Sequence, residues 1–178
     1  MLAAGRGVIV DDGVGRFTID EVVARSGVAK TTIYRWWPSR QSLMLDVIHS
    51  LFVPVTTPNT GAVRDDLRTY LEFYGAAPQE ATSRLLPDLC SAAQRDPELA
   101  ELRDTLVAEK RQPVLTILEL AQARGEIAQT ADLDVLASLI IGTLTYTRSV
   151  RGQRVDDALV SQVVDAALAF GACSPAEV

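Results

Sequence analysis

Apolar residues recur three and four positions apart along most of this chain, a spacing that predicts helices with one buried face. The segments 132–148 and 156–171 show this pattern most clearly. Their repeating apolar positions are Val135, Leu136, Leu139, Ile140 and Leu144 in the first segment, and Leu159, Val163, Val164, Ala167, Leu168 and Phe170 in the second. No run alternates with period two over a useful length, and no internal repeat is present. The pattern therefore predicts an all-α fold.

Glycine, proline and capping residues divide the pattern into separate helices. We expect Gly5 and Gly7 to weaken the first helix, and Pro113 to break or bend the helix that begins at Pro97. The expected helices cover residues 2–10, 18–26, 30–37, 40–51, 63–77, 82–94, 97–112, 114–124, 132–151 and 156–171.

The stretch from Thr18 to Arg40 has the pattern of two short helices joined by a tight turn, in the sequence TIDEVVARSGVAKTTIYRWWPSR. Thr18 and Glu21 have capping-box spacing. Gly27 supplies the residue that the turn needs, and Pro38 ends the second helix. Basic residues on the second helix are what a protein needs to place that helix in the major groove of DNA. The stretch therefore predicts a helix-turn-helix.

Charge is distributed unevenly along the chain, whose formal net charge is −6 and whose pI is near 4.8. The first 50 residues hold six basic and five acidic side chains, whereas the remainder holds eleven basic and eighteen acidic ones. A linker rich in Pro and Thr over residues 54–61 predicts a boundary between a first domain, 1–52, and a second domain, 53–178. Because DNA repels an acidic surface, we expect the second domain to do something other than hold DNA.

The residues that enzymes and metal sites require are scarce. Two cysteines, Cys90 and Cys173, and one histidine, His49, stand at spacings that match no familiar metal site and no disulfide framework. No nucleophile, base or carboxylate pair forms a recognisable motif, so we expect no enzymatic activity, no cofactor and no metal. No segment has the length of a secretion signal or a membrane-spanning helix, so we expect a soluble, cytoplasmic protein that binds no membrane.

The stretch over residues 17–45 closely resembles the DNA-binding segment of the TetR family of transcriptional regulators. The chain from Ala62 onwards resembles one type of ligand domain in that family more loosely, including RDPEL at 95–99 and RGEI at 124–127. The resemblance implies a DNA-binding homodimer on a palindromic operator. It further implies a repressor that a small-molecule effector, bound in the second domain, releases from the operator.

By their positions in the family's motif, eight residues are expected to contact DNA. Thr18, Tyr34 and Arg40 are expected at phosphates, which position the protein without specifying sequence. Arg35 is expected to read guanine through two hydrogen bonds. The full set is Thr18, Lys30, Thr31, Thr32, Tyr34, Arg35, Trp36 and Arg40. Solvated charges and a neutral surface, with no DNA role, remain the alternative for these positions.

The two tryptophans are adjacent, and adjacent side chains on a helix point about 100° apart. We therefore expect one of them to be exposed. Trp36 is expected along a sugar-phosphate edge, whereas Trp37 is expected to pack inside with Ile33.

Two departures from the family's pattern affect this first domain. Ala29 replaces a frequent serine at the start of the second motif helix, which removes about 1 kcal/mol of capping. Family members usually begin with a further, often basic, segment, and this sequence begins at Met1 inside the first helix.

The last two long helices carry more apolar surface than one packing partner can bury, which predicts a two-fold symmetric four-helix interface. Gly142 and Thr143 allow a partner helix to approach closely. The predicted interface residues are Leu139, Gly142, Thr143, Tyr146, Val163, Ala167 and Phe170. Completion of a monomeric core is the alternative for these helices.

The predicted ligand pocket is lined by Tyr70, Phe73, Tyr74, Leu86, Cys90 and Leu118. Core packing is an equally open alternative for each of them. Because charged residues are rare at the apolar positions, we expect a hydrophobic or aromatic effector. A DNA-binding regulator without a small-molecule ligand, controlled by a protein partner, is the alternative function.

Overall fold

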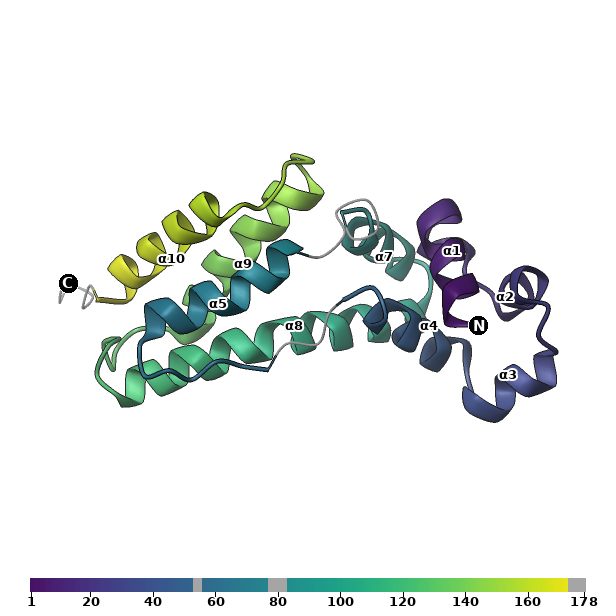
Figure 1. Cartoon of the computed structure of the whole chain (residues 1–178), viewed down its shortest axis with the longest axis horizontal. Coiled ribbons are helices and arrows are strands. Elements are labelled where there is room, and N and C mark those ends of the chain that lie inside the picture. Colours follow the sequence, from purple (N-terminus) through teal and green to yellow (C-terminus); the bar gives the residue numbers. More distant parts are fainter. Residues whose placement is uncertain (53–55, 77–82, 173–178) are drawn as a thin grey trace. The chain divides into compact units, whose positions relative to one another are not determined.

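The computed structural model describes residues 1–52, 56–76 and 83–172, apart from the side chains of residues 73–76. Every long regular element in these ranges is an α-helix, with one short 3₁₀ turn, which confirms the predicted all-α fold (Figure 1). The elements are α1 (Leu2–Asp12), η1 (Val14–Arg16), α2 (Ile19–Ser26), α3 (Lys30–Trp36), α4 (Arg40–His49), α5 (Val63–Ala76), α7 (Leu85–Ala93), α8 (Pro97–Ala123), α9 (Leu133–Ser149) and α10 (Asp157–Ala172).

The helices form two compact units, each with its own apolar core. The first unit comprises residues 1–53 and 77–106, and the second comprises residues 54–76 and 107–178. Helix α8 therefore contributes its beginning to the first unit and its remainder to the second. The sequence predicted two consecutive domains, residues 1–52 and 53–178. That division stays a prediction.

Close contact between α1 and α4 shapes the core of the first unit. Gly5 is buried, and a Cβ atom at this position would lie only 2.5 Å from Cγ2 of Val47 and 3.3 Å from Cε2 of Phe17. Gly5 was expected to weaken the first helix, but α1 continues to Asp12 because its apolar face is buried. Tertiary packing here outweighs the low helix propensity of glycine.

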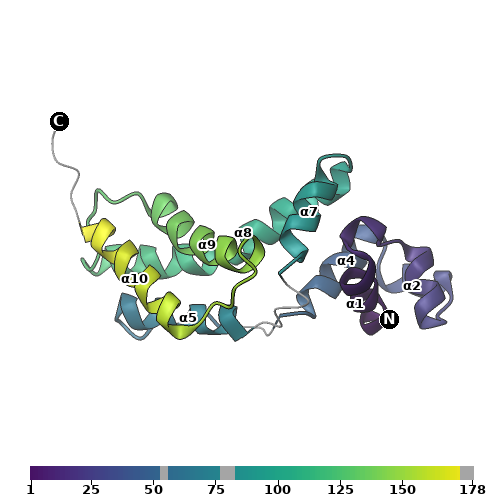
Figure 2. The ribbon, with the colours of Figure 1, turned by 90° about the horizontal axis from the view of Figure 1, so that it is seen from above.

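The second unit is a helical bundle in which α10 packs against both α5 and α9 (Figure 2). One of its buried polar groups is the carboxylate of Asp66, which is 1% exposed and accepts hydrogen bonds from the backbone N–H and hydroxyl of Thr60 at 2.7 and 2.8 Å. Glu126 likewise accepts from the backbone N–H of Val63 at 2.8 Å. These bonds fix the start of α5, whose first N–H groups have no partner within the helix.

Pro113 was predicted to break or bend a helix, and the prediction of a break is wrong. Helix α8 runs without interruption from Pro97 to Ala123, with Pro113 inside it. Proline removes one backbone hydrogen bond there. The apolar residues that follow it, Val114, Ile117 and Leu118, are completely buried and hold the second half of the helix in the bundle.

The short helix predicted over residues 82–94 is described as α7, Leu85–Ala93, and the start of its predicted range lies outside the described residues. Pro87 occupies its first turn, where a missing N–H costs nothing. None of the described helices is both long and apolar enough to cross a lipid bilayer.

Candidate nucleic-acid interface

Helices α2 and α3 form the predicted helix-turn-helix. The Thr18 hydroxyl accepts the backbone N–H of Glu21 at 3.1 Å and begins α2. Gly27 has φ 67° and ψ 7°, a left-handed conformation that costs glycine little, and its N–H bonds to the carbonyl of Val23. Ala29 precedes α3 without a side-chain capping bond, as the sequence predicted.

The Glu21 carboxylate does not complete the capping box, because it accepts from Nε of Arg25 at 3.1 Å instead. The packing of α3 depends on Ile33, which is completely buried together with Val22 of α2. Burial of Ile33 therefore stabilises α3, which has only seven residues and would not be stable as an isolated helix.

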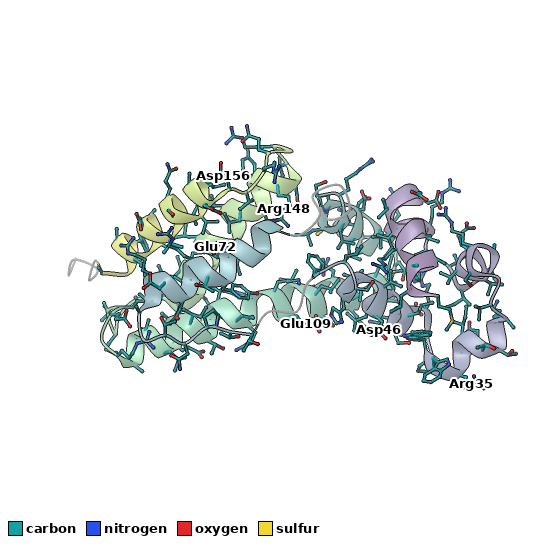
Figure 3. The ribbon with its side chains drawn as sticks, in the orientation of Figure 1. Arg35, Asp46, Glu72, Glu109, Arg148 and Asp156 are labelled. Atoms are coloured by element: carbon teal, nitrogen blue, oxygen red, sulfur yellow. The ribbon has the colours of Figure 1, made fainter. Side chains whose placement is uncertain are left out.

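The remaining side chains of α3 face solvent. Lys30, Thr31, Tyr34, Arg35 and Trp36 are exposed, and Thr32 is half-buried. These six are the α3 residues predicted to contact DNA, so one helix presents them together on the surface. Arg35, labelled in Figure 3, lies with its guanidinium 6.0 Å from the ring centre of Trp36, within the range of a cation–π interaction.

The two adjacent tryptophans have different environments, as predicted. Trp36 is 66% exposed, whereas Trp37 is partly buried against the core of the first unit. The indole N–H of Trp37 donates to the carboxylate of Asp46 at 2.7 Å, a bond that ties the end of α3 to α4. Sequence analysis missed Asp46, which lies nine positions away on another helix and carries no local signal.

The helix-turn-helix stretch carries four cations, Arg25, Lys30, Arg35 and Arg40, and nearby carboxylates pair with the first two. Arg25 donates to Asp11 at 2.7 Å, to Asp12 and to Glu21, and Lys30 donates to Asp20 at 2.8 Å. The hydrogen bond that Arg25 donates to Asp11 raises the pKa of Arg25, and the one that Lys30 donates to Asp20 raises the pKa of Lys30.

Arg40, a predicted phosphate contact, is also paired with acidic residues. Its Nη2 lies 2.5 Å from a carboxylate oxygen of Asp96 and 3.0 Å from one of Glu98. The bond from Arg40 lowers the pKa of Asp96. Among the residues that the structure describes, Arg35 alone of the four motif cations contacts no carboxylate. The pairing of Arg40 spans 56 positions in sequence, so no local pattern could predict it.

The predicted dimer residues divide into an exposed and a buried group. Leu139, Gly142, Thr143 and Tyr146 are exposed on α9, and Phe170 is exposed on α10. Val163 and Ala167 are buried in the core of their own unit, because they are on the face of α10 that packs inward. The surface that α9 and α10 offer to a partner therefore excludes these two residues.

The predicted pocket residues are distributed over both units. Tyr70 and the completely buried Leu118 belong to the second unit, whereas Leu86 and the exposed Cys90 belong to the first. The side chains of Phe73 and Tyr74 lie outside the described residues. The pocket thus stays a prediction.

Two cations of the second unit were missed. Arg148 of α9, which is labelled in Figure 3, is only 5% exposed. Burial lowers the pKa of Lys110 on α8, with a smaller contribution from the charge of Arg148. The hydroxyl of Tyr70 donates to the backbone carbonyl of Lys110 at 3.4 Å. Tyr70 of α5 and Lys110 of α8 thus meet in a half-buried polar contact within the second unit.

The first unit also contains a polar groove of about 410 Å³ between the end of α1 and one side of α7. Residues 9–16 line one wall. The other wall consists of Arg84, Leu85, Asp88, Ser91, Ala92 and Arg95. Neither Leu86 nor Cys90 lines this groove, so it is not the predicted ligand pocket.

Comparison with known proteins agrees with this architecture. A family model described as bacterial regulatory proteins, tetR family, matches residues 1–47, and one described as tetracyclin repressor-like, C-terminal domain, matches residues 57–167. A DNA-binding transcriptional repressor TetR from Mycobacteroides abscessus is 30% identical over 168 residues, which cover 93% of this chain and 88% of that protein. The uncharacterized HTH-type transcriptional regulator YdeS from Bacillus subtilis is 26% identical over 166 residues, covering 92% and 84%.

Among solved structures, the TetR family transcription regulator SCO0332 has a TM-score of 0.69 and 30% sequence identity, covering 98% of this chain and 96% of that one. A helix-turn-helix with an exposed, basic and aromatic second helix, joined to an all-helical remainder, defines a DNA-binding transcriptional regulator. The chain belongs to the TetR family of these regulators. The members that it matches are transcriptional regulators and not enzymes.

Proposed function

We propose that this protein is a transcriptional repressor that binds a palindromic DNA operator as a homodimer and leaves it when a small molecule binds the second unit. The observation that carries this proposal is the solvent-facing side of α3, which collects a lysine, an arginine, two aromatic rings and two threonines on one short helix. The name of the relative from Mycobacteroides abscessus supports a repressor.

The exposed side of α3 matches the requirements of base recognition. Arginine donates two parallel hydrogen bonds to guanine, and Arg35 has no carboxylate partner among the described residues that would have to be displaced. Thr31 and Thr32 lie at the N-terminal end of the helix, which is the end that reaches base edges in such motifs. Tyr34 is 45% exposed and is available for a phosphate.

An exposed apolar stripe on α9 supports the homodimer. Val135, Leu139 and Tyr146 are 40%, 43% and 55% exposed, and Gly142 is exposed between them. Spacings of four, three and four residues place these positions on one side of the helix. Large apolar side chains gathered in this way are typical of an interaction surface, and two-fold symmetry would place the same stripe of a second chain against it.

The apolar interior of the second unit supports a hydrophobic or aromatic effector. Effector pockets are mostly apolar with a few polar groups that orient the ligand. Arg148 and Lys110 are such groups in this unit. Release follows if the effector favours a conformation of the dimer in which the two α3 helices no longer fit successive grooves.

Selection of bound sequences from a random DNA pool tests the proposal. We expect a palindrome whose half-sites lie about 34–36 Å apart, or a multiple of that distance, and which binds two chains. Melting curves with a small-molecule panel then identify an effector that stabilises the protein and weakens DNA binding. A dimer that selects a palindrome but responds to no small molecule would favour control by a protein partner. A folded dimer that enriches no sequence would refute the DNA-binding part of the proposal.

A further inference from the structure

Arg40 is the first residue of α4, directly after the capping residue Ser39. Its guanidinium points at two carboxylates from one short segment, Asp96 before α8 and Glu98 in the first turn of α8. Both carboxylates contact the same nitrogen, Nη2, at 2.5 and 3.0 Å. All three residues belong to the first unit, and the Arg40 side chain is only 26% exposed.

Asp96 is held in place by a second bond. One of its carboxylate oxygens accepts the backbone N–H of Glu98 at 3.0 Å, in the manner of a helix cap, while the other oxygen accepts from Arg40. The hydrogen bond from Arg40 also lowers the pKa of Asp96 below its ordinary value. The negative charge that faces Arg40 is therefore fixed in position.

The carboxylates that pair with Arg40 lie much farther away in the sequence than those that pair with Arg25 and Lys30. Arg25 and Lys30 are paired with Asp11, Asp12, Glu21 and Asp20, all of which lie within the first 21 residues. The partners of Arg40 follow the helix-turn-helix by more than 50 positions. The carboxylates that pair with Arg40 thus belong to a segment outside the helix-turn-helix.

We propose that Asp96 and Glu98 compete with a DNA phosphate for Arg40, and so lower the affinity of the protein for its operator. This inference rests on the proposed DNA-binding function. A guanidinium binds a carboxylate and a phosphate through the same kind of N–H group, and the two carboxylates occupy Nη2 of Arg40. A phosphate at Arg40 would lie within a few ångströms of two carboxylates, and like charges at that distance are unfavourable.

The test is a titration of the full chain with a fluorescent duplex of the selected sequence, measured by anisotropy. Asp96→Asn keeps the cap of α8, because asparagine caps a helix as well as aspartate does. Glu98→Gln leaves the cap untouched and provides a second variant. Glu101→Gln is the matched control, since Glu101 is an exposed carboxylate of the same helix that does not contact Arg40.

We expect the double variant Asp96→Asn/Glu98→Gln to bind the duplex about two- to tenfold more tightly than the wild type, as the loss of two partly exposed ion pairs would allow. The slope of log K against log salt should become steeper by about one phosphate contact. In an Arg40→Met background the same two changes should have no effect. The control Glu101→Gln should bind as the wild type does.

Unchanged or weaker binding by the double variant would overturn the inference, because it would assign the ion pairs a purely structural role. Equal tightening in the Arg40→Met background would overturn it as well, since the two acids would then act by general repulsion of DNA. A wild-type chain that binds no selected duplex would refute the proposed function, and this inference with it. The wild-type titration therefore separates the two failures.

Discussion

Replacement of Gly5 by alanine tests the close packing of α1 against α4. Alanine is the better helix former by about 0.5–1 kcal/mol, so helix propensity alone predicts a more stable protein. The new Cβ atom would lie 2.5 Å from Cγ2 of Val47, a distance that requires movement of one of the two groups. Val47 and Phe17 are completely buried, so neither has room to move. Overpacking of this kind costs about 1–3 kcal/mol.

Gly7 provides the matched control in the same helix. A Cβ atom at Gly7 would meet only Nη1 of Arg25 at 3.1 Å and a carboxylate oxygen of Asp11 at 3.9 Å. Nη1 donates to Asp11, but it ends a long, partly exposed side chain that needs to shift by only a few tenths of an ångström. We therefore expect Gly7→Ala to stabilise the protein by up to about 1 kcal/mol and Gly5→Ala to destabilise it by about 1–2 kcal/mol. For a chain of this size, each kcal/mol corresponds to about 2–4 °C in Tm.

Thermal melting followed by circular dichroism at 222 nm, at one protein concentration, measures both variants. The cost of Gly5→Ala should also fall in a Val47→Ala background, because the clashing methyl group is then absent. A Gly5→Ala protein that melts as high as Gly7→Ala would refute the packing argument. Equal effects of Gly5→Ala in the two backgrounds would show that the strain arises elsewhere.

Three further predictions concern DNA contact, assembly and pH. Arg35→Ala should lose about 1–3 kcal/mol of binding free energy and relax base preference at one position of each half-site, as measured by titration of operator variants; an equal loss on every sequence would assign Arg35 to phosphates instead. Tyr146→Arg should yield monomers in analytical ultracentrifugation. Val107→Arg, which alters another exposed apolar residue, should leave the dimer intact. If both variants are dimers, the interface lies away from α9. The backbone N–H of Val63 and, to a smaller extent, Arg124 lower the pKa of Glu126 in the folded chain below its ordinary 4.5. This carboxylate therefore contributes stability above that pH and loses it as the pH falls through the folded pKa, so Glu126→Gln should show a shallower decline of Tm below about pH 4.5 than the wild type; parallel declines would count against the linkage.

The helix-turn-helix could be predicted from the sequence because its determinants are local. A hydroxyl at Thr18, a glycine at position 27 and a proline at position 38 each act within four residues of the boundary that they set. Capping, left-handed backbone and proline geometry operate over this range, so a sequence displays them directly. Helix geometry likewise predicted that one of the two adjacent tryptophans is exposed, and the motif position indicated Trp36.

The interactions that sequence analysis missed are set by packing between distant segments. Pro113 was expected to interrupt a helix, but the apolar residues after it keep α8 continuous. Val163 was assigned to a dimer surface because α10 is apolar on more than one side, and only the structure shows which side packs inward. The partners of Arg40 and of Trp37 lie on other helices, where no spacing rule applies.

The position of the tryptophans has a practical consequence for spectroscopy. The chain contains two tryptophans, and both lie at the end of α3, the helix proposed to enter DNA: Trp36 is its last residue and Trp37 follows directly. Excitation at 295 nm therefore produces emission from this one place in the molecule. Trp36 is exposed beside Arg35, so its emission should be quenched by a solute in the solvent. Trp37 donates its indole N–H to Asp46, so its emission should report on that hydrogen bond. The protein thus carries an intrinsic optical probe at the end of α3, and quenching by iodide would follow occupancy of this helix by a duplex without any label.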